Sequence, residues 1–332
     1  MERAFVLGGG GWGTALALVL DERGMQVELF VHDAAYAAEM AKSRRNPRYL
    51  PGVEIPDRIG VTSDAAALAG DGVVFSVVPS QFLRSTLERW RKPLAAGKRI
   101  FVTATKGIEQ ETLRRPSEIV REVVGDVPLV VVSGPSHAEE VARRMPTTVV
   151  AASSDKGLAL RIQDLLFTER FRVYTNPDPL GVELAGALKN VISIAGGIVD
   201  GLGFGDNTKA ALLTRGVVEM ARLGAALGAQ RETFFGLAGI GDLITSCISP
   251  HGRNRAVGIR VGRGERVADI VASMRQVAEG VRTAAAVHEL AAAKGVETPI
   301  CEQVYRVLHE GKDPSRAVRD LMGRQLKDEQ DW

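Results

Sequence analysis

The sequence predicts an α/β fold, a Rossmann-type doubly wound and mostly parallel sheet, followed by an all-helical C-terminal domain. Short apolar runs of strand type alternate with helix-length segments from the start of the chain to about residue 175. The prolines of Asn176–Pro179 then interrupt the pattern, and beyond them strand-type runs almost vanish. A length of 332 residues fits two domains, which we place at 1–178 and 179–332.

The alternation places each element of the first domain in order. Apolar runs predict strands at Ala4–Leu7, Gln26–Val31, Val73–Val78, Ile100–Thr103, Leu129–Ser133, Thr147–Ala152 and Phe171–Thr175. The stretches between most of them predict helices at Trp12–Arg23, Ala34–Ser43, Gln81–Arg91, Ser117–Val124, His137–Arg144 and Lys156–Leu166. Strands separated by helices are typical of βαβ units, so we expect a parallel sheet covered on both faces.

The second domain shows helical periodicity alone. It predicts helices at Leu180–Leu202, Lys209–Leu227, Val267–Met274, Thr283–Lys294 and Ile300–Glu310. The first of these is apolar nearly all round, which is typical of a helix buried inside its domain.

Composition excludes several classes of protein. Glycine accounts for 36 of the residues, but in no three-residue period, which excludes collagen. Apolar residues at 45% and charged residues at 25% are typical of a globular enzyme rather than a disordered chain. A net charge of +2 offers no basic surplus for a nucleic-acid partner.

The cysteines and histidines predict neither a disulfide framework nor a metal site. Cys247 and Cys301 lack the spacing of zinc ligands, so we expect reduced thiols. The five histidines show no HxxxH pattern. No secretory signal pattern precedes the first strand, and no uninterrupted apolar run reaches about 18 residues. We therefore expect a cytoplasmic protein without membrane insertion.

A glycine fingerprint follows the first predicted strand and opens a helix. Gly8, Gly10 and Gly13 form G-x-G-x-x-G in the context that predicts dinucleotide binding. Gly8 permits the tight turn, Gly10 lets the backbone approach a pyrophosphate, and Gly13 lets helix and strand pack closely. The free N–H groups of the helix N-terminus then attract the phosphates.

The residues that read the adenosine ribose leave the choice between NAD and NADP open. Asp33 stands twenty residues after Gly13, where an acidic residue usually binds the ribose hydroxyls. His32 precedes it, and Arg44 and Arg45 follow in the same region, where they are within reach of a 2′-phosphate.

Lys189, followed by Asn190, stands in the middle of the apolar helix. A charged lysine there is costly unless it is paired or lines a wet cleft. Burial lowers the pKa of a lysine toward values useful for general acid–base chemistry. The alternative is a lysine that extends along the helix to water, and spacing alone does not separate the two.

Further polar residues follow predicted strands or stand in glycine-rich loops. Lys106 follows one strand, and the Gly134–Ser136 loop follows the next, at the edge where open α/β sheets bind ligands. Asp242 ends a glycine-rich segment, where the alternative is a helix N-cap. Arg253 and Asn254 are suited to binding a phosphate, although a short basic run is more often a solvated face.

The motifs then match a known family in order. They are Gly8–Ala15, Asn46–Gly52, Thr105–Glu109, Ser133–Ser136, Glu183–Asn190, Gly239–Leu243, Arg253–Asn254 and Glu279–Gly280. Over essentially its whole length the chain resembles the bacterial NAD(P)-dependent sn-glycerol-3-phosphate dehydrogenases. The resemblance implies reversible reduction of dihydroxyacetone phosphate to glycerol 3-phosphate, the precursor of the phospholipid backbone, by a homodimer that uses NAD(P)H.

The resemblance also implies a role for individual residues. The catalytic residues would be Lys189, as proton donor and acceptor, and Lys106. The cofactor site would contain Gly8, Gly10, Gly11, Trp12, Gly13, His32, Asp33, Tyr49, Lys106, Ala138, Arg253, Val277 and Glu279. The substrate site would contain Lys106, Gly134, Ser136, Lys189, Asp242, Gly252, Arg253 and Asn254.

This sequence departs from the family at two positions. Gly11 and Gly252 stand where serine is common, so we expect the loss of one hydroxyl contact to each phosphorylated ligand. Arginine is common where His32 stands, which weakens the inference to NADP. Two alternatives remain: a β-hydroxyacid dehydrogenase with an unphosphorylated substrate, and a dinucleotide sensor without catalysis. Arg253 and Asn254 argue against the first, and Lys106 and Lys189 against the second.

Overall fold

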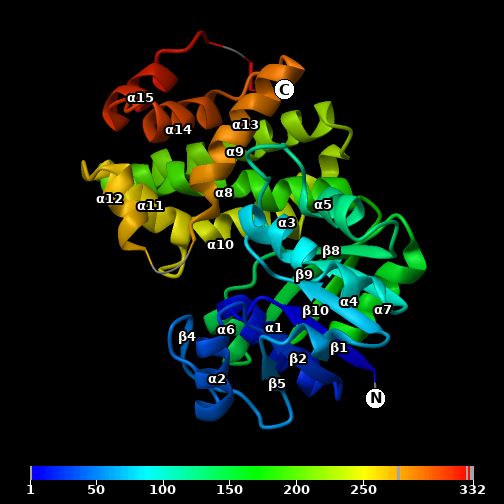
Figure 1. The fold of residues 1–332 in the computed structure, drawn as a ribbon. Coiled ribbons are helices and arrows are strands. Elements are labelled where there is room, and N and C mark those ends of the chain that lie inside the picture. The colour runs from blue at the N-terminus through cyan, green and yellow to red at the C-terminus, as the bar shows by residue number, and fades with distance from the viewer. Residues whose placement is uncertain (1, 275–276, 327, 330–332) are drawn as a thin grey trace. The chain divides into compact units, whose positions relative to one another are not determined.

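The structure is a computed structural model that describes residues 2–274, 277–326 and 328–329, and it divides into two compact units (Figure 1). The first unit takes the described residues up to Lys106 together with Arg115–Pro179. The second takes Gly107–Arg114 and the described residues from Leu180 onward. The short segment Gly107–Arg114 thus belongs with the second unit, although it falls within the first domain predicted from the sequence.

The first unit contains an eight-stranded sheet. Its strands are β1 (Arg3–Leu7), β2 (Gln26–Phe30), β5 (Gly60–Thr62), β6 (Gly72–Ser76), β7 (Arg99–Thr103), β8 (Leu129–Ser133), β9 (Thr147–Ala152) and β10 (Phe171–Asn176). They are arranged in the order β10-β9-β8-β7-β6-β1-β2-β5. Neighbouring strands are parallel except for β8 and β9. The predicted doubly wound, mostly parallel sheet is therefore confirmed.

The helices of the first unit follow the strands as the alternation predicts. They are α1 (Gly11–Glu22), α2 (Ala34–Ser43), α3 (Ser80–Arg89), α4 (Arg91–Ala95), α5 (Pro116–Val123), α6 (Ala138–Ala142) and α7 (Lys156–Leu166), with a 3₁₀ turn at Ala65–Leu68. The side chains of Asp33 and Asp155 cap α2 and α7 by accepting backbone N–H groups of the first turn. Pro116 starts α5, where a missing N–H costs nothing.

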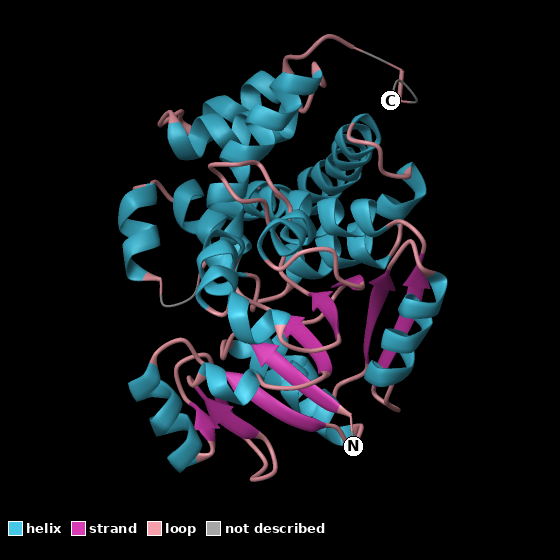
Figure 2. Cartoon of the chain, turned by 45° about the vertical axis from the view of Figure 1, so that its right-hand side comes forward, coloured by secondary structure: helices cyan, strands magenta, loops and turns pink. Residues whose placement is uncertain are grey.

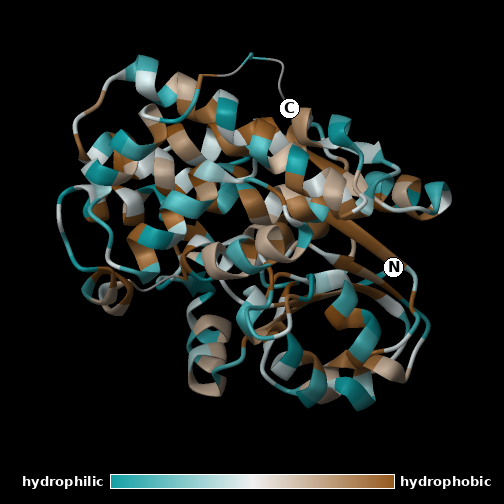
Figure 3. Ribbon diagram, turned by 90° about the horizontal axis from the view of Figure 1, so that it is seen from above, coloured by the Kyte–Doolittle hydropathy of each residue, from teal (hydrophilic) through white to brown (hydrophobic). Residues whose placement is uncertain are grey.

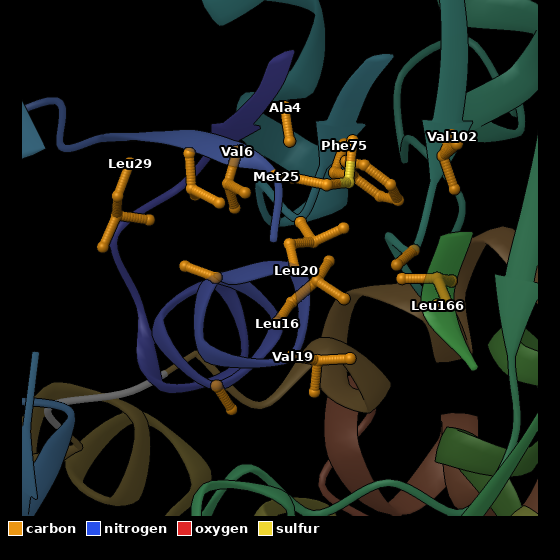
Figure 4. Packing of buried hydrophobic residues seen from close by; sticks show 14 of the residues in the cluster. Ala4, Val6, Leu16, Val19, Leu20, Met25, Leu29, Phe75, Val102 and Leu166 are labelled. Carbon is orange, nitrogen blue, oxygen red and sulfur yellow. The ribbon is translucent and has the colours of Figure 1, made fainter. Parts of the chain in front are cut away.

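Helix α1 packs its apolar face against the sheet. Leu16 and Leu20 are fully buried and point toward Val6 and Phe75 of the strands (Figure 4). Strands that can be seen in Figure 3 are largely hydrophobic, and β7 and β8 are buried at every position, as expected where both faces are covered. This packing fixes the N-terminus of α1 directly beyond the end of β1.

Among its described residues the second unit contains helices and the loops that join them, and no strand (Figure 2). Its helices are α8 (Pro179–Gly201), α9 (Asp206–Ala226), α10 (Asp242–Ile248), α11 (Arg253–Gly262), α12 (Val267–Ser273), α13 (Glu279–Lys294), α14 (Pro299–His309) and α15 (Pro314–Met322), with a 3₁₀ turn at Arg231–Phe235 and a π turn at Leu237–Gly241. The predicted all-helical domain is confirmed for these residues.

Helix α8 is the core of the second unit. It is long and apolar enough to cross a membrane by length and composition, but its most apolar window is entirely buried inside the protein. A Cβ at Gly197 would lie 2.1 Å from the carbonyl oxygen of Arg255, and one at Gly258 would lie 2.1 Å from that of Ile194. Glycine at these two positions therefore lets α8 and α11 approach each other closely.

Several elements differ from the prediction. Helix α13 begins at Glu279 rather than Thr283, and β6 ends at Ser76 rather than Val78. Short elements that the sequence analysis did not predict include α10, α11, α15, β5 and the antiparallel pair β3 (Arg45–Asn46) and β4 (Leu50–Glu54). The strands among them span two to five residues, too few for a clear alternation pattern.

Candidate active site

The glycine fingerprint forms a turn between β1 and α1 that leaves room for a ligand. Gly8 has φ +119°, which disfavours any residue with a side chain. A Cβ at Gly13 would lie 1.8 Å from the carbonyl oxygen of Gly8, so this glycine is needed for helix and strand to pack. A Cβ at Gly10 would meet nothing within 4 Å. The turn formed by Gly8–Gly13, the dinucleotide cradle, is therefore open at Gly10, which leaves the space that a pyrophosphate needs to approach the backbone.

The fingerprint also lies where the strand order reverses. β1 pairs with β2 on one side and with β6 on the other, and the chain crosses over between them. Open α/β sheets bind their ligands at this switch point, beyond the carboxyl ends of the strands. Gly10 has no side chain to cap the first N–H groups of α1, which remain suited to an anion. The residues present therefore fit a dinucleotide.

Three of the predicted cofactor residues lie together beside this turn. A Cβ at Gly11 would lie 2.7 Å from the carbonyl oxygen of Tyr49 and 3.5 Å from the Cβ of Ala138. The loop of Tyr49 is held there by Asn46, a fully buried amide that donates to the carbonyl of Gly9 (3.1 Å) and to the hydroxyl of Thr14 (2.7 Å). Asn46 also accepts from the backbone N–H of Tyr49 (3.2 Å). Nothing in the sequence analysis assigned Asn46 this role beyond its place in a family motif.

Other predicted cofactor residues occupy the flanks of the same unit. The ring of Trp12 lies 6.5 Å from that of Phe171. Asp33 caps α2, and its Oδ1 accepts the backbone N–H of Tyr36 at 3.0 Å. This hydrogen bond is the largest cause that lowers the pKa of Asp33, so its carboxylate is ionised at neutral pH. His32 precedes it in the chain.

The predicted substrate residues of the first unit meet at the ends of β7 and β8. The ammonium of Lys106 donates to the carbonyl oxygen of Gly134 at 3.0 Å. The hydroxyl of Ser136 donates to the same oxygen at 2.9 Å. Gly134 has φ +132°, and a Cβ there would lie 3.0 Å from the Cα of Val149. The structure thus brings together the lysine and the loop that the sequence places after neighbouring strands.

In the second unit, Lys189 is buried and paired. Its Nζ donates to Oδ1 of Asp242 at 3.1 Å and to Oγ of Ser246 at 2.7 Å. Only 7% of its side chain is exposed, so the alternative of a lysine reaching water is wrong. The helix N-cap alternative for Asp242 is wrong as well, because Gly241 holds that position and Asp242 begins α10 with its carboxylate on Lys189.

Ser246 is a residue of this group that the sequence analysis missed. It stands one helical turn after Asp242 on α10, so both side chains reach the same lysine. Their spacing of four was the available signal, but serine also occurs at many helix positions that belong to no site. Nearby Cys247 is buried, and burial raises the pKa of its thiol to about 11, which makes it inert. Both cysteines are free and buried.

The predicted phosphate-binding residues begin α11 and contact the start of α13. The guanidinium of Arg253 donates to the carbonyl oxygen of Val277 at 3.0 Å. Asn254 accepts the backbone N–H of Gly280 (3.0 Å) and donates to the side chain of Asn190 (2.9 Å). Asn190 therefore links Asn254 to α8, the helix of Lys189.

Gly252 completes this side of the second unit. A Cβ there would lie 2.5 Å from the carbonyl oxygen of Ser246, so the backbone of α10 occupies the space that a side chain would need. The structure thus brings Lys189, Asp242, Gly252, Arg253 and Asn254 into one neighbourhood, with Glu279 opening α13 next to Val277 and Gly280.

Comparison with known proteins identifies the family. The model of the NAD-dependent glycerol-3-phosphate dehydrogenase N-terminus matches residues 3–159, and that of the C-terminus matches residues 178–319. The chain is 51% identical to the glycerol-3-phosphate dehydrogenase [NAD(P)+] of Geobacillus kaustophilus over 335 aligned residues, covering 100% of this chain and 97% of the relative. It is 49% identical to that of Chlorobium limicola, covering 98% of each chain.

A solved structure agrees with this result. The crystal structure of glycerol-3-phosphate dehydrogenase from Coxiella burnetii superposes with a TM-score of 0.91 at 39% identity, covering 97% of this chain and 99% of the other. The fold, the dinucleotide cradle and both halves of the sequence therefore lead to one conclusion: the chain belongs to the NAD-dependent glycerol-3-phosphate dehydrogenase family.

Proposed function

We propose that the chain reduces dihydroxyacetone phosphate to sn-glycerol 3-phosphate, reversibly, with NADH or NADPH. The observation that carries this proposal is the buried ammonium of Lys189, held by Asp242 in a chain of this family. The product is the backbone of glycerophospholipids, so the enzyme would connect carbohydrate metabolism to phospholipid biosynthesis. We assign cofactor binding to a domain of residues 1–178 and most substrate contacts to a domain of residues 179–332.

For the cofactor we propose the residues beside the glycine turn, together with those that the resemblance to the family implies in the rest of the chain. The pyrophosphate would lie against the turn, where Gly10 leaves space and the N–H groups of α1 are available. When bound, the nicotinamide supplies or accepts the hydride. The full set is Gly8, Gly10, Gly11, Trp12, Gly13, His32, Asp33, Tyr49, Lys106, Ala138, Arg253, Val277 and Glu279.

Lys189 acts as the general acid and the general base of the reaction. In reduction, its ammonium gives a proton to the oxygen of the substrate carbonyl as that carbon receives the hydride. In oxidation, the neutral amine takes the proton of the hydroxyl. Asp242 stabilises the charged form and, with Ser246, fixes the position of Nζ. For Lys106 we propose contacts to both substrate and cofactor, as the resemblance to the family implies.

The substrate phosphate is bound by Arg253 and Asn254. A guanidinium keeps its charge at every accessible pH and matches the geometry of a phosphate. Gly134, Ser136, Asp242 and Gly252 complete the substrate contacts that we propose. We expect Arg253→Ala to raise the KM for dihydroxyacetone phosphate at least about tenfold, because a charge-assisted contact is lost. An unchanged KM would remove Arg253 from the phosphate site.

We also propose a homodimer in the cytoplasm, without membrane insertion. Membership of the family supports the dimer, and the complete burial of the most apolar window of α8 supports a helix that stays inside the protein. Light scattering coupled to size-exclusion chromatography measures the mass of the assembly. The mass of a single chain, 35.6 kDa, would contradict the dimer.

The consumption of reduced nicotinamide tests the activity directly. Purified protein is given dihydroxyacetone phosphate with NADH and with NADPH in parallel, and the loss of nicotinamide absorbance is recorded. We expect turnover that inorganic phosphate inhibits by competition. Cofactor binding without consumption would indicate a dinucleotide sensor, and turnover of unphosphorylated hydroxyacids instead would indicate a β-hydroxyacid dehydrogenase. Either result would contradict the proposal.

A further inference from the structure

A carboxylate and a guanidinium lie side by side where the adenosine ribose is expected to bind. Asp33 is ionised and stands at the end of β2, where a carboxylate binds the ribose 2′-hydroxyl and repels a 2′-phosphate. The guanidinium of Arg48 lies 3.6 Å from its Oδ2, with half of the arginine side chain exposed. A carboxylate that would exclude NADP is therefore partly neutralised by the guanidinium of Arg48.

Arg48 is held in this position from several directions. Its guanidinium lies 3.8 Å above the ring centroid of Tyr36, a cation–π contact. Its backbone N–H donates to the hydroxyl of Tyr36 at 3.0 Å, and that hydroxyl donates to Asn46 at 2.7 Å. Glu39 lies 3.7 Å from the second guanidinium nitrogen. The half-exposed guanidinium thus has three partners beside the ribose position, in Asp33, Glu39 and the ring of Tyr36.

Arg44 and Arg45, which the sequence places within reach of a 2′-phosphate, do not pair with Asp33 in the structure. The guanidinium of Arg44 donates to the carbonyl oxygens of Ile55, Pro56 and Ile59. These bonds hold the backbone of residues 55–59. Arg45 begins β3 with an exposed side chain. The arginine that the structure pairs with Asp33 is Arg48 instead.

We propose that Arg48 is the residue through which this chain accepts the 2′-phosphate of NADP(H), by screening Asp33 and binding the phosphate. The proposal rests on the use of NAD(P)H proposed above and specifies how its adenosine end is read. Asp33 still provides a carboxylate where an acidic residue usually binds the ribose hydroxyls of NAD(H). The affinity for NADP(H) therefore depends on Arg48 far more than the affinity for NAD(H) does.

Binding measurements test this without turnover. Dissociation constants for NADH and NADPH are determined by nicotinamide fluorescence for the unmodified protein, Arg48→Gln and Arg48→Lys. The matched control is Arg45→Gln, which removes an exposed arginine three residues away. We expect Arg48→Gln to weaken NADPH binding about 10- to 30-fold, as expected for a lost charge-assisted contact, with at most about a threefold change for NADH. Arg48→Lys should recover most of the loss.

Fragments of the cofactor that lack the nicotinamide test the role of Arg48 independently of the proposed catalytic activity. Adenosine 2′,5′-bisphosphate and AMP differ by the 2′-phosphate and contain no nicotinamide, so their ratio of affinities reports on Arg48 even if the protein reduces no substrate. We expect Arg48→Gln to abolish the preference between them. An unchanged ratio in Arg48→Gln, or an equal loss in Arg45→Gln, would overturn the role of Arg48.

Discussion

The ammonium of Lys189 lies 3.1 Å from the carboxylate of Asp242, and both side chains are almost fully buried, with 7% and 4% exposed. Burying two charges costs solvation energy that their attraction offsets only with good geometry and further hydrogen bonds. Ser246 supplies one such bond, at 2.7 Å from Nζ. A pair of this kind is weak evidence for stability, and its placement is better explained by the proton chemistry proposed for Lys189.

Ser246 is expected to act as a positioning residue. Ser246→Ala removes the hydroxyl that accepts from Lys189, and we expect kcat to fall about tenfold, as for the loss of one hydrogen bond to a charged group. The KM for dihydroxyacetone phosphate should change less than about twofold, since no phosphate contact is lost. Thr245→Ala is the matched control, because that hydroxyl bonds to the carbonyl of Gly241 instead. Wild-type kcat in Ser246→Ala would contradict this role.

Substitutions at Gly10 and Gly13 are expected to affect different properties, cofactor binding at Gly10 and stability at Gly13. At Gly10 a methyl group meets no protein atom, and φ −76° suits any residue, so Gly10→Ala should keep its melting temperature while cofactor binding weakens. Gly13→Ala instead places a methyl group 1.8 Å from a backbone oxygen and should lower the free energy of unfolding by about 1–3 kcal/mol. Thermal unfolding and cofactor titration of both variants check this. Equal melting temperatures would contradict the steric assignment.

Glu219 is expected to make stability depend on pH. Its carboxylate is buried and accepts the backbone N–H groups of Ile300 (2.8 Å) and Cys301 (3.2 Å), and burial raises its pKa to about 7. The folded state therefore binds the proton more tightly than the unfolded chain, whose pKa is 4.5. The contribution is full below pH 4.5 and is lost as pH rises through 7, by about 3 kcal/mol.

The variant Glu219→Gln checks the sign. The amide keeps an oxygen for the backbone N–H groups but does not ionise, so it should gain stability relative to the unmodified protein between pH 5 and pH 8. Urea unfolding at the two pH values measures the difference. A difference that does not change with pH would show that Glu219 is not the titrating group.

The arrangement of the sheet and helices could be predicted because buried parallel strands are apolar runs separated by whole helices. The antiparallel pair β3–β4 could not, since β4 is largely exposed and alternation is weak in so short a strand. Lys189 could be identified because a charge in an apolar helix is costly. Its partner Asp242 follows 53 residues later in the chain, and local pattern does not predict such a contact.

Gly11 and Gly252 also show what cannot be predicted from the sequence alone. The sequence predicts only a missing hydroxyl at Gly11 and at Gly252. In the structure, carbonyl oxygens of Tyr49 and Ser246 stand 2.7 Å and 2.5 Å from where a Cβ would be. Glycine at these positions thus accommodates a closer approach of neighbouring backbone, which is visible only in three dimensions.

The turnover of Lys189 variants is the sharpest test of Lys189 as the proton donor and acceptor. Lys189→Met removes the proton donor, and Lys189→Arg keeps a positive charge beside Asp242 but does not release its proton at accessible pH. Lys209→Met is the control, because Lys209 pairs with Asp200 in the same unit. We expect both Lys189 variants to lose at least about 100-fold in kcat for dihydroxyacetone phosphate while still binding NADH, and Lys209→Met to stay near the unmodified rate. A Lys189 variant that folds, binds NADH and turns over at the unmodified rate would contradict this role of Lys189.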